Sequence, residues 1–342
     1  MNHDFYMKKC LALALKGKGN VAPNPLVGSV IVCNGEIIGE GYHEEFGKEH
    51  AEVNAINSVK DQALLKQSTI YVNLEPCSHF GKTPPCSDLI IKKGIPHVVI
   101  GAIDDHEKVA GKGVEKLEKA GIKVEVNILK EQCLELNKRF YKFHNKGIPY
   151  VILKWAESKD GFISKSKEAI NNGENNWITG NESKVFVHQQ RATEQAILVG
   201  KNTVINDNPS LTTRLVEGKN PLRVIIGKID ENDDLTVLRD QLPTLIFNLT
   251  TNKTNGNKEW IRFDGQIESI LKELATREIQ SVIIEGGTNT IEQFIQANLW
   301  DEAYNFVGDI EFKNEIKAPK INKQPLFTNQ LGKDKLRVYF NK

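Results

Sequence analysis

Apolar and polar positions along the first 146 residues predict helices and strands in turn. Apolar residues at helical spacing predict helices, and short runs rich in β-branched residues predict strands. Helices are expected at 4–16, 49–60, 86–93, 113–120 and 132–146, and strands at 27–32, 36–42, 69–74, 97–102 and 123–128. Asn34 and Gly35 separate the first two strands, as in a hairpin. This alternation predicts a layered α/β domain.

A second alternation follows the break at 147–149. Strands are expected at 150–155, 196–199, 223–226, 244–247 and 281–284, and helices at 183–190, 267–277 and 288–297. The polar stretches 230–234 and 252–259 are interpreted as surface loops. A chain of 342 residues, at about 150 residues per domain, fits two domains, which we place at 1–146 and 147–342.

Charge and cysteine content narrow the function classes. Lys and Arg number 45 against 44 Asp and Glu, so the basic excess typical of nucleic-acid-binding proteins is missing, and a small-molecule substrate is favoured. Five unevenly spaced cysteines form a poor disulfide framework and fit reduced thiols in the cytoplasm. No apolar run approaches the about 18 residues of a membrane helix, so no membrane partner is expected.

One His and two Cys predict a zinc site. His50 opens a predicted helix, Cys77 follows a predicted strand, and Cys86 opens the next helix. Three such ligands are typical of catalytic Zn²⁺, whose fourth position is left to water. The helix start is expected to lower the pKa of the Cys86 thiol. Glu52, two residues after His50, is the candidate proton shuttle, as in zinc deaminases.

Alternatives remain for these residues. Eight residues separate the two cysteines, where nucleic-acid deaminases have two. His79, inside this insert, is either a fourth ligand or a residue of the pocket wall. Asn24, between two prolines, can donate to and accept from a heterocycle, or it is simply a turn residue. Taken singly, the His and Cys residues would be ordinary surface and core residues.

Taken together, the motifs resemble the family of bifunctional riboflavin-biosynthesis deaminase/reductases. The matching segments are 23–28, 50–52 and 75–86, followed by 154–161, 176–179, 191–192, 207–214 and 285–287. The resemblance implies an N-terminal three-layer cytidine-deaminase-like domain that deaminates a diaminohydroxypyrimidine carrying a phosphoribosylamino group. It also implies a C-terminal dihydrofolate-reductase-like α/β domain that reduces the ribosyl group to ribityl with NADPH. We further expect a homo-oligomer, either a dimer or a tetramer.

The second half contains weaker signals of its own. Gly286 and Gly287 lie between a predicted strand and a predicted helix, which indicates a phosphate site or a tight turn. Arg191 and Arg214 are candidates for a substrate phosphate, or solvated surface residues. By resemblance, the NADPH contacts are Ala156, Trp177, Thr203, Asp207, Gly287, Thr288, Asn289 and Thr290. By resemblance, the substrate contacts are Asn175, Arg191, Leu211, Arg214 and Glu285.

Two positions depart from the family pattern, and three other functions stay open. Lys159 replaces the more usual Leu, and Gly227-Lys228 replaces an Asp followed by a small polar residue. Trp177 could instead be a core residue and Asp207 a loop cap. The first alternative function is a nucleic-acid or nucleoside deaminase with a C-terminal binding module. The second is a zinc-stabilised binding protein, and the third is a deaminase whose reductase half is an inactive remnant.

Overall fold

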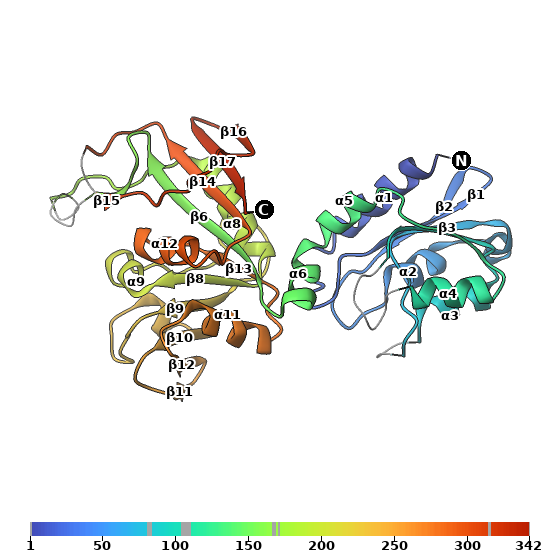
Figure 1. Cartoon of the computed structure of the whole chain (residues 1–342), viewed down its shortest axis with the longest axis horizontal. Coiled ribbons are helices and arrows are strands. Elements are labelled where there is room, and N and C mark those ends of the chain that lie inside the picture. Colours follow the sequence, from blue (N-terminus) through green and yellow to red (C-terminus); the bar gives the residue numbers. More distant parts are fainter. Residues whose placement is uncertain are drawn as a thin grey trace. The chain divides into compact units, whose positions relative to one another are not determined.

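The computed structural model describes residues 2–80, 84–103, 111–165, 169, 172–313 and 316–341. The chain forms two compact units, Met1–Lys146 (unit 1) and Gly147–Lys342 (unit 2), each described by itself (Figure 1). Gly81, Lys82 and Thr83 of the cysteine insert lie outside the described residues. Of the helices in the described ranges, none is long and apolar enough to span a bilayer.

Unit 1 is built on a five-stranded sheet with the order β2-β1-β3-β4-β5. The strands are β1 (Gly28–Cys33), β2 (Glu36–Tyr42), β3 (Thr69–Leu74), β4 (His97–Ala102) and β5 (Lys123–Glu125). β1 pairs antiparallel with β2 and β3, whereas β3, β4 and β5 are parallel. The carboxyl end of β3 therefore opens beside that of β4, just before Cys77.

Helices cover both faces of this sheet, as Figure 1 shows. They are α1 (His3–Leu15), α2 (Ala51–Ser58), α3 (Cys86–Lys93), α4 (Lys112–Lys119), α5 (Lys130–Leu136) and α6 (Lys138–Lys146), with a 3-10 helix η1 (Gln62–Gln67). Neighbouring residues of β1 face opposite cores, because side chains alternate along a strand. Ile31 packs with Ile56 of α2, and Val30 packs with Met7 of α1. The expected three-layer architecture is confirmed.

Unit 2 contains a ten-stranded sheet with the order β11-β12-β10-β9-β8-β13-β6-β14-β17-β16. Its strands are β6 (Tyr150–Ser158), β8 (Ala196–Gly200), β9 (Leu222–Ile226), β10 (Thr244–Asn248), β11 (Lys253–Asn255), β12 (Lys258–Arg262), β13 (Ser281–Ile284), β14 (Glu302–Gly308), β16 (Phe327–Leu331) and β17 (Asp334–Phe340). The run from β12 to β14 is parallel. β7 (Phe162–Ser164) and β15 (Ile316–Lys317) form a separate pair.

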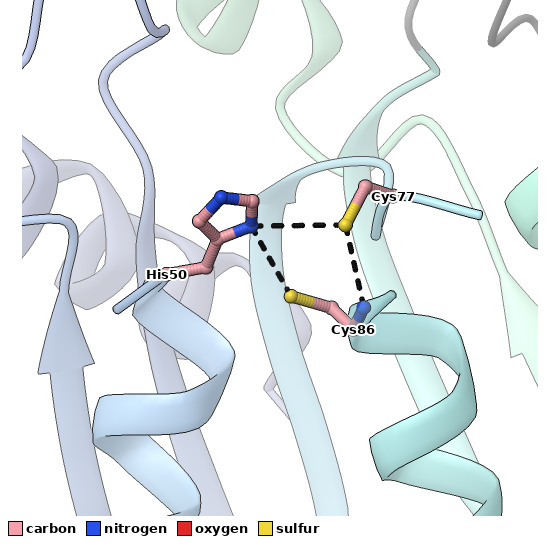
Figure 2. Close-up of side chains that lie close together, drawn as sticks. All are labelled: His50, Cys77 and Cys86. Carbon is pink, nitrogen blue, oxygen red and sulfur yellow. Dashed lines mark hydrogen bonds between the residues drawn. The ribbon is translucent and has the colours of Figure 1, made fainter. Parts of the chain in front are cut away.

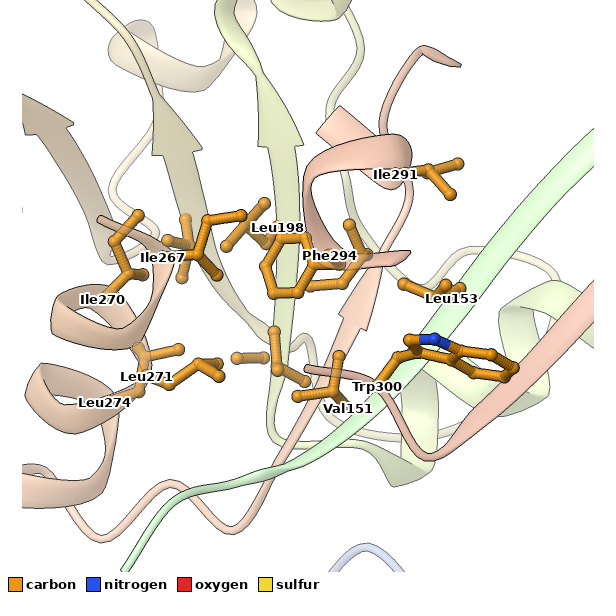
Figure 3. Packing of buried hydrophobic residues seen from close by; sticks show 14 of the residues in the cluster. Val151, Leu153, Leu198, Ile267, Ile270, Leu271, Leu274, Ile291, Phe294 and Trp300 are labelled. Atoms are coloured by element: carbon orange, nitrogen blue, oxygen red, sulfur yellow. The ribbon is translucent and has the colours of Figure 1, made fainter. Parts of the chain in front are cut away.

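The helices of unit 2 cover the sheet from both sides and enclose separate cores. They are α8 (Asn181–Thr193), α9 (Lys201–Asp207), α10 (Thr236–Arg239), α11 (Ile267–Thr276) and α12 (Thr288–Gln296). Figure 3 shows the core under α11 and α12, where Leu271 and Phe294 pack against Leu198 of β8. Ile197, the residue before Leu198 in β8, faces the other core with Val204 of α9.

Two local expectations were wrong, each for a tertiary reason. The stretch 252–259, interpreted as a loop, contains β11 and the start of β12, because Lys258 is buried against Asp240 and Trp260 is buried in the core. The expected helix 132–146 is divided at Asn137. The Asn137 amide bonds the backbone N–H and C=O of Leu26, which lies before β1.

Candidate functional site

Three side chains of unit 1 with metal-binding atoms lie together at the ends of three elements. His50 directly precedes α2, Cys77 follows β3, and Cys86 is the first residue of α3. Their ligand atoms all lie within 4.8 Å of one another, and Figure 2 shows the imidazole and both sulfurs turned toward one another. In the part of the chain that the structure describes, this is the one such group. The fold therefore brings the predicted set together.

The backbone at the start of α3 favours a negatively charged sulfur in this cluster, as a bound cation requires. His50 Nδ1 lies 3.7 Å from the sulfur of Cys77 and 3.4 Å from that of Cys86. The backbone N–H of Cys86 donates to the Cys77 sulfur at 3.3 Å. Because this N–H belongs to the first turn of α3, it stabilises negative charge on Cys77.

The pKa values of the two thiols diverge as a result. Hydrogen bonds from Cys86 and then from His50 lower the pKa of Cys77 to about 4. The hydrogen bond with Cys77, together with burial, raises the pKa of Cys86. The N–H at the start of α3, which was expected to act on the Cys86 thiol, is directed at the sulfur of Cys77. A bound Zn²⁺ would ionise both thiols.

Glu52 lies beside this cluster on the first turn of α2 and is 3% exposed. Burial raises the pKa of Glu52 to about 7, with a smaller contribution from Cys77. His79, in contrast, is exposed and does not belong to the group of three. Three ligands and one adjacent carboxyl group match the donor set of a catalytic zinc site better than that of a closed structural site.

Asn24 is linked to the cluster through a buried histidine. Its side-chain Nδ2 lies 3.1 Å from His43 Nε2, and His43 Nδ1 lies 2.9 Å from the backbone carbonyl oxygen of Glu49. The rings of His43 and His50 meet edge to face, with centroids 5.5 Å apart. Burial lowers the pKa of His43. Asn24 is thus held on the same side of unit 1 as the cluster, as a substrate contact requires.

A second buried carboxylate, that of Glu75, anchors the chain just before Cys77. Glu75 accepts hydrogen bonds from the backbone N–H groups of Gly113 at 2.7 Å, Gly111 at 3.0 Å and Val114 at 3.2 Å. These groups lie at the start of α4, where a carboxylate is favoured. A Cβ atom at Gly113 would come within 2.2 Å of the Pro76 carbonyl oxygen, so glycine permits the approach.

In unit 2, an ion-pair network joins helix α8, strand β6 and the residue that follows strand β13. Arg191 of α8 donates from Nε and Nη2 to the two carboxylate oxygens of Glu285, at 2.9 and 2.8 Å. Lys154 of β6 donates to Glu285 at 3.4 Å. Burial by itself would raise the pKa of Glu285, but Lys154 and Arg191 lower it to about 2. Glu285 is therefore held as a carboxylate.

Thr212 connects this network to Arg214. Arg191 Nη1 donates to the Thr212 carbonyl oxygen at 3.2 Å, and Arg214 Nη1 donates to the Thr212 hydroxyl at 3.0 Å. Arg214 itself is exposed. The structure thus brings together the predicted substrate residues Arg191, Arg214 and Glu285. Leu211 of the same segment is 3% exposed, with its side chain in the core.

The predicted cofactor residues gather partly around the start of α12. A Cβ atom at Gly287 would lie 3.9 Å from the Thr203 hydroxyl, and one at Gly286 would lie 2.6 Å from Cβ of Thr290. Gly287, the residue before α12, makes no side-chain cap. Thr288 donates to the Lys317 carbonyl oxygen, and Asn289 accepts from Gln293.

The remaining predicted residues lie at more open positions. Trp177 is 69% exposed, so the alternative of a core residue was wrong. Lys184 Nζ lies 3.9 Å from its ring centroid. Asn175 accepts a hydrogen bond from the backbone N–H of Trp177 at 3.0 Å. Asp207 is exposed at the end of α9, and Ala156 lies half-buried on β6.

The two departures from the family pattern, at Lys159 and at Gly227-Lys228, can each be placed in the structure. Lys159 is half-exposed and pairs with Glu311 at 3.4 Å. Gly227 has a φ of +123°, which residues with a side chain rarely adopt. Glycine therefore suits this turn, whereas an Asp in the same conformation would be strained.

The sequence-based interpretation assigned no site role to three residues of these sites, namely His43, Glu75 and Lys154, although Glu75 and Lys154 begin two of the matching segments. Lys154 carried a usable signal, because it is a charged residue within an otherwise apolar central strand, where a partner is required. Glu75 gave a weaker signal at the end of the fully buried β3. His43 gave none, since a single histidine in a polar segment is unremarkable.

Comparisons with known proteins relate both units to one family. Residues 1–102 match the cytidine and deoxycytidylate deaminase zinc-binding region, and residues 149–308 match the RibD C-terminal domain. The chain is 38% identical to the riboflavin biosynthesis protein RibD of Aquifex aeolicus over 98% of both chains. It is 41% identical to that of Bacillus amyloliquefaciens, over 90% of this chain and 84% of the relative.

Solved structures agree over both units. The Thermotoga maritima diaminohydroxyphosphoribosylaminopyrimidine deaminase/5-amino-6-(5-phosphoribosylamino)uracil reductase superposes with a TM-score of 0.88 at 36% identity, over 98% of this chain and 97% of that one. A crystal form of Acinetobacter baumannii RibD superposes with a TM-score of 0.87 at 30% identity, over 99% and 98%.

Proposed function

We propose that this chain, which belongs to the RibD family of riboflavin biosynthesis proteins, deaminates a pyrimidine in unit 1 and reduces the product's sugar group in unit 2. The observation that carries the deaminase half is the convergence of His50, Cys77 and Cys86 beside the buried carboxyl group of Glu52. The proposed substrate is 2,5-diamino-6-(5-phosphoribosylamino)pyrimidin-4-one, in keeping with the activity named for the Thermotoga maritima relative.

The residues of unit 1 suit a hydrolytic deamination. His50, Cys77 and Cys86 would hold Zn²⁺, which when bound lowers the pKa of a water molecule to about 7. A C–O bond forms between the ring carbon and the water oxygen, the bond from that carbon to the exocyclic amino nitrogen breaks, and ammonia leaves. Glu52 accepts the proton of the attacking water and returns protons to the ring and to the departing amino group. Asn24 contacts the substrate with its amide.

The residues of unit 2 suit reduction of a phosphorylated sugar. NADPH is the proposed cofactor and supplies the hydride when bound. Lys154 donates to Glu285 at 3.4 Å, and we place the reacting sugar beside these two side chains. Arg191 holds Glu285 in place. Arg214, whose guanidinium is exposed, is the proposed contact for the substrate phosphate. Asn175 and Leu211 are further proposed substrate contacts, Leu211 through its backbone.

The proposed NADPH site is centred on the start of α12. Thr203, Gly287 and Thr290 converge there, and the first N–H groups of a helix favour a phosphate. The other proposed contacts are Ala156, Trp177, Asp207, Thr288 and Asn289. Both reactions act on a phosphorylated small molecule, so neither nucleic acid nor a membrane is required as a partner.

A homo-oligomer, a dimer or a tetramer, stays a prediction. It is supported by β16 at the end of the ten-stranded sheet, an edge strand without charged residues whose first four residues are exposed. Uncharged edge strands pair readily with another chain. Light scattering of the purified protein measures the oligomeric state.

The proposed function is tested by supplying each half with its own substrate. With the diaminopyrimidine as substrate, the protein should release ammonia. With the deaminated product supplied directly, it should oxidise NADPH, which is followed as a fall in the absorbance of the reduced cofactor. Glu52→Gln should lower the rate of ammonia release by roughly 10²–10⁴-fold while retaining zinc and NADPH consumption. Undiminished ammonia release by this variant would remove Glu52 from the mechanism.

A further inference from the structure

We infer that His43 is a positioning residue that fixes the direction of the Asn24 amide, so that the deaminase site presents the oxygen Oδ1 of Asn24 to its substrate as a hydrogen-bond acceptor. The inference rests on the proposed deaminase function. It assigns a role to His43 and selects the class of substrate group that Asn24 recognises, namely an N–H or O–H donor.

The first step is the hydrogen bond between His43 and the backbone. His43 Nδ1 lies 2.9 Å from the carbonyl oxygen of Glu49. A carbonyl oxygen can only accept, so Nδ1 carries the proton. In a neutral imidazole the other nitrogen, Nε2, is then an acceptor. Glu49 directly precedes His50, so the tautomer of His43 is set by the same stretch of backbone that positions a metal ligand.

The second step is that the acceptor at His43 Nε2 fixes the orientation of the Asn24 amide. His43 Nε2 lies 3.1 Å from the side-chain nitrogen of Asn24, which can only donate. With Nδ2 directed at His43, the Oδ1 atom of the same amide is turned away from the ring. The reverse orientation would set two acceptors, Oδ1 and Nε2, against each other. The amide direction is therefore decided by the tautomer.

The third step is that the relay, defined as the hydrogen-bonded chain from Glu49 through His43 to Asn24, is held rigidly. His43 is 2% exposed, and its backbone N–H donates to the carbonyl oxygen of Val27 at 2.9 Å. The backbone N–H of Asn24 donates to Val21 at 2.9 Å. Both ends of the relay are therefore anchored by the backbone, and the orientation is in place before substrate arrives.

The test is a double-mutant cycle on the full chain, with zinc content and NADPH consumption as controls for the metal site and for unit 2. His43→Ala should raise the KM for ammonia release about tenfold, the size of one neutral hydrogen bond, and leave zinc bound. In an Asn24→Ala background, His43→Ala should raise KM less than about twofold, because its effect acts through that amide. The same fold-increase in KM in both backgrounds, or loss of zinc from His43→Ala, would overturn the inference.

His43→Gln is the conservative variant. The Gln amide can donate to Glu49 with its nitrogen and accept from Asn24 with its oxygen, so KM should stay within about threefold of the wild type. A Gln variant as impaired as His43→Ala would contradict the relay.

A readout independent of activity is the ¹⁵N spectrum of the His43 ring, assigned by comparison with His43→Gln. We expect a protonated Nδ1 and an Nε2 resonance that shifts in Asn24→Ala. A protonated Nε2 would refute the inference even if the chain deaminates the pyrimidine. A wild-type chain that releases no ammonia but has the expected spectrum would instead contradict the proposed function.

Discussion

The two candidate sites lie beyond the carboxyl ends of parallel strands and differ in how their charge is balanced. Cys77 follows β3 in unit 1, and Glu285 follows β13 in unit 2. In unit 1 the pKa of Cys77 is lowered to about 4, beside a thiol and a carboxyl group whose pKa values are raised. In unit 2 the carboxylate of Glu285 already has two cationic partners.

This difference indicates which of the two sites depends on an added cation. The two thiols of unit 1 become equivalent ligands only when both are ionised around a metal ion. The negative charge at this site is therefore balanced only when Zn²⁺ is bound. The network of unit 2 is satisfied by the chain itself, so its arrangement persists without ligand. Five predictions test this contrast.

Metal removal should separate the two units most strongly. Chelation is expected to reduce ammonia release below detection, because no other group in the cluster can activate water, and to leave NADPH consumption unchanged. Cys77→Ser should likewise lose zinc, measured by elemental analysis. Cys33→Ser, at a buried cysteine outside the cluster, is the matched control and should keep it. Ammonia release by the metal-free protein at the full rate would contradict the zinc site.

Glu285→Gln should destabilise unit 2 by about 3–5 kcal/mol, because it leaves Arg191 and Lys154 without their buried counter-charge. All four tryptophans, Trp155, Trp177, Trp260 and Trp300, belong to unit 2, so tryptophan fluorescence during denaturant unfolding reports this unit alone. Glu259→Gln, which removes the partly exposed partner of Arg277, is the control and should cost less than about 1 kcal/mol.

The same variant predicts a pH dependence. The pKa of Glu285 in the folded chain is lowered from 4.5 to about 2. A lowered pKa contributes stability that is present above about pH 4.5 and is lost as the pH falls toward 2. The difference in unfolding free energy between wild type and Glu285→Gln should therefore narrow from pH 6 to pH 3. A constant difference would show that the ion pairs do not contribute through this carboxylate.

Glu75→Gln should weaken unit 1 by about 1–3 kcal/mol, because an amide nitrogen would face backbone N–H donors at the start of α4. Since Glu75 lies two residues before Cys77, we expect faster transfer of zinc to a chromogenic chelator. Glu115→Gln, at an exposed position in the first turn of the same helix, is the control. Equal transfer rates for the two variants would show that Glu75 does not position Cys77.

Trp177→Ala should change the stability of unit 2 by less than about 0.5 kcal/mol, because its side chain is 69% exposed. The KM for NADPH should nevertheless rise several-fold if this ring contacts the cofactor. Leu326→Ala, at an equally exposed apolar residue, should change neither quantity. A KM that stays at the wild-type value would remove Trp177 from the cofactor site.

Much of the fold was predictable because local signals agreed with it. The apolar runs of β3, β4 and β13 and the Asn34-Gly35 hairpin are local patterns, and the structure contains each of these elements. β12 was missed because its polar residues gave no strand signal, and pairing with β10 and β11 makes it a strand. The break at Asn137 was missed because its cause is a hydrogen bond to Leu26, which is 111 residues away.

By itself, the sequence determined the family, the two-part fold and the types of donor atoms at the deaminase site. Those properties follow from residue type and spacing within short segments. The tertiary structure decided which sulfur accepts the first N–H of α3, which residue contacts the Asn24 amide, and how Lys154, Arg191 and Glu285 pair their charges. Each depends on atoms within hydrogen-bond distance, and up to 131 residues separate such partners along the chain. Electrostatic effects at that range are set by the folded arrangement, which no local pattern records.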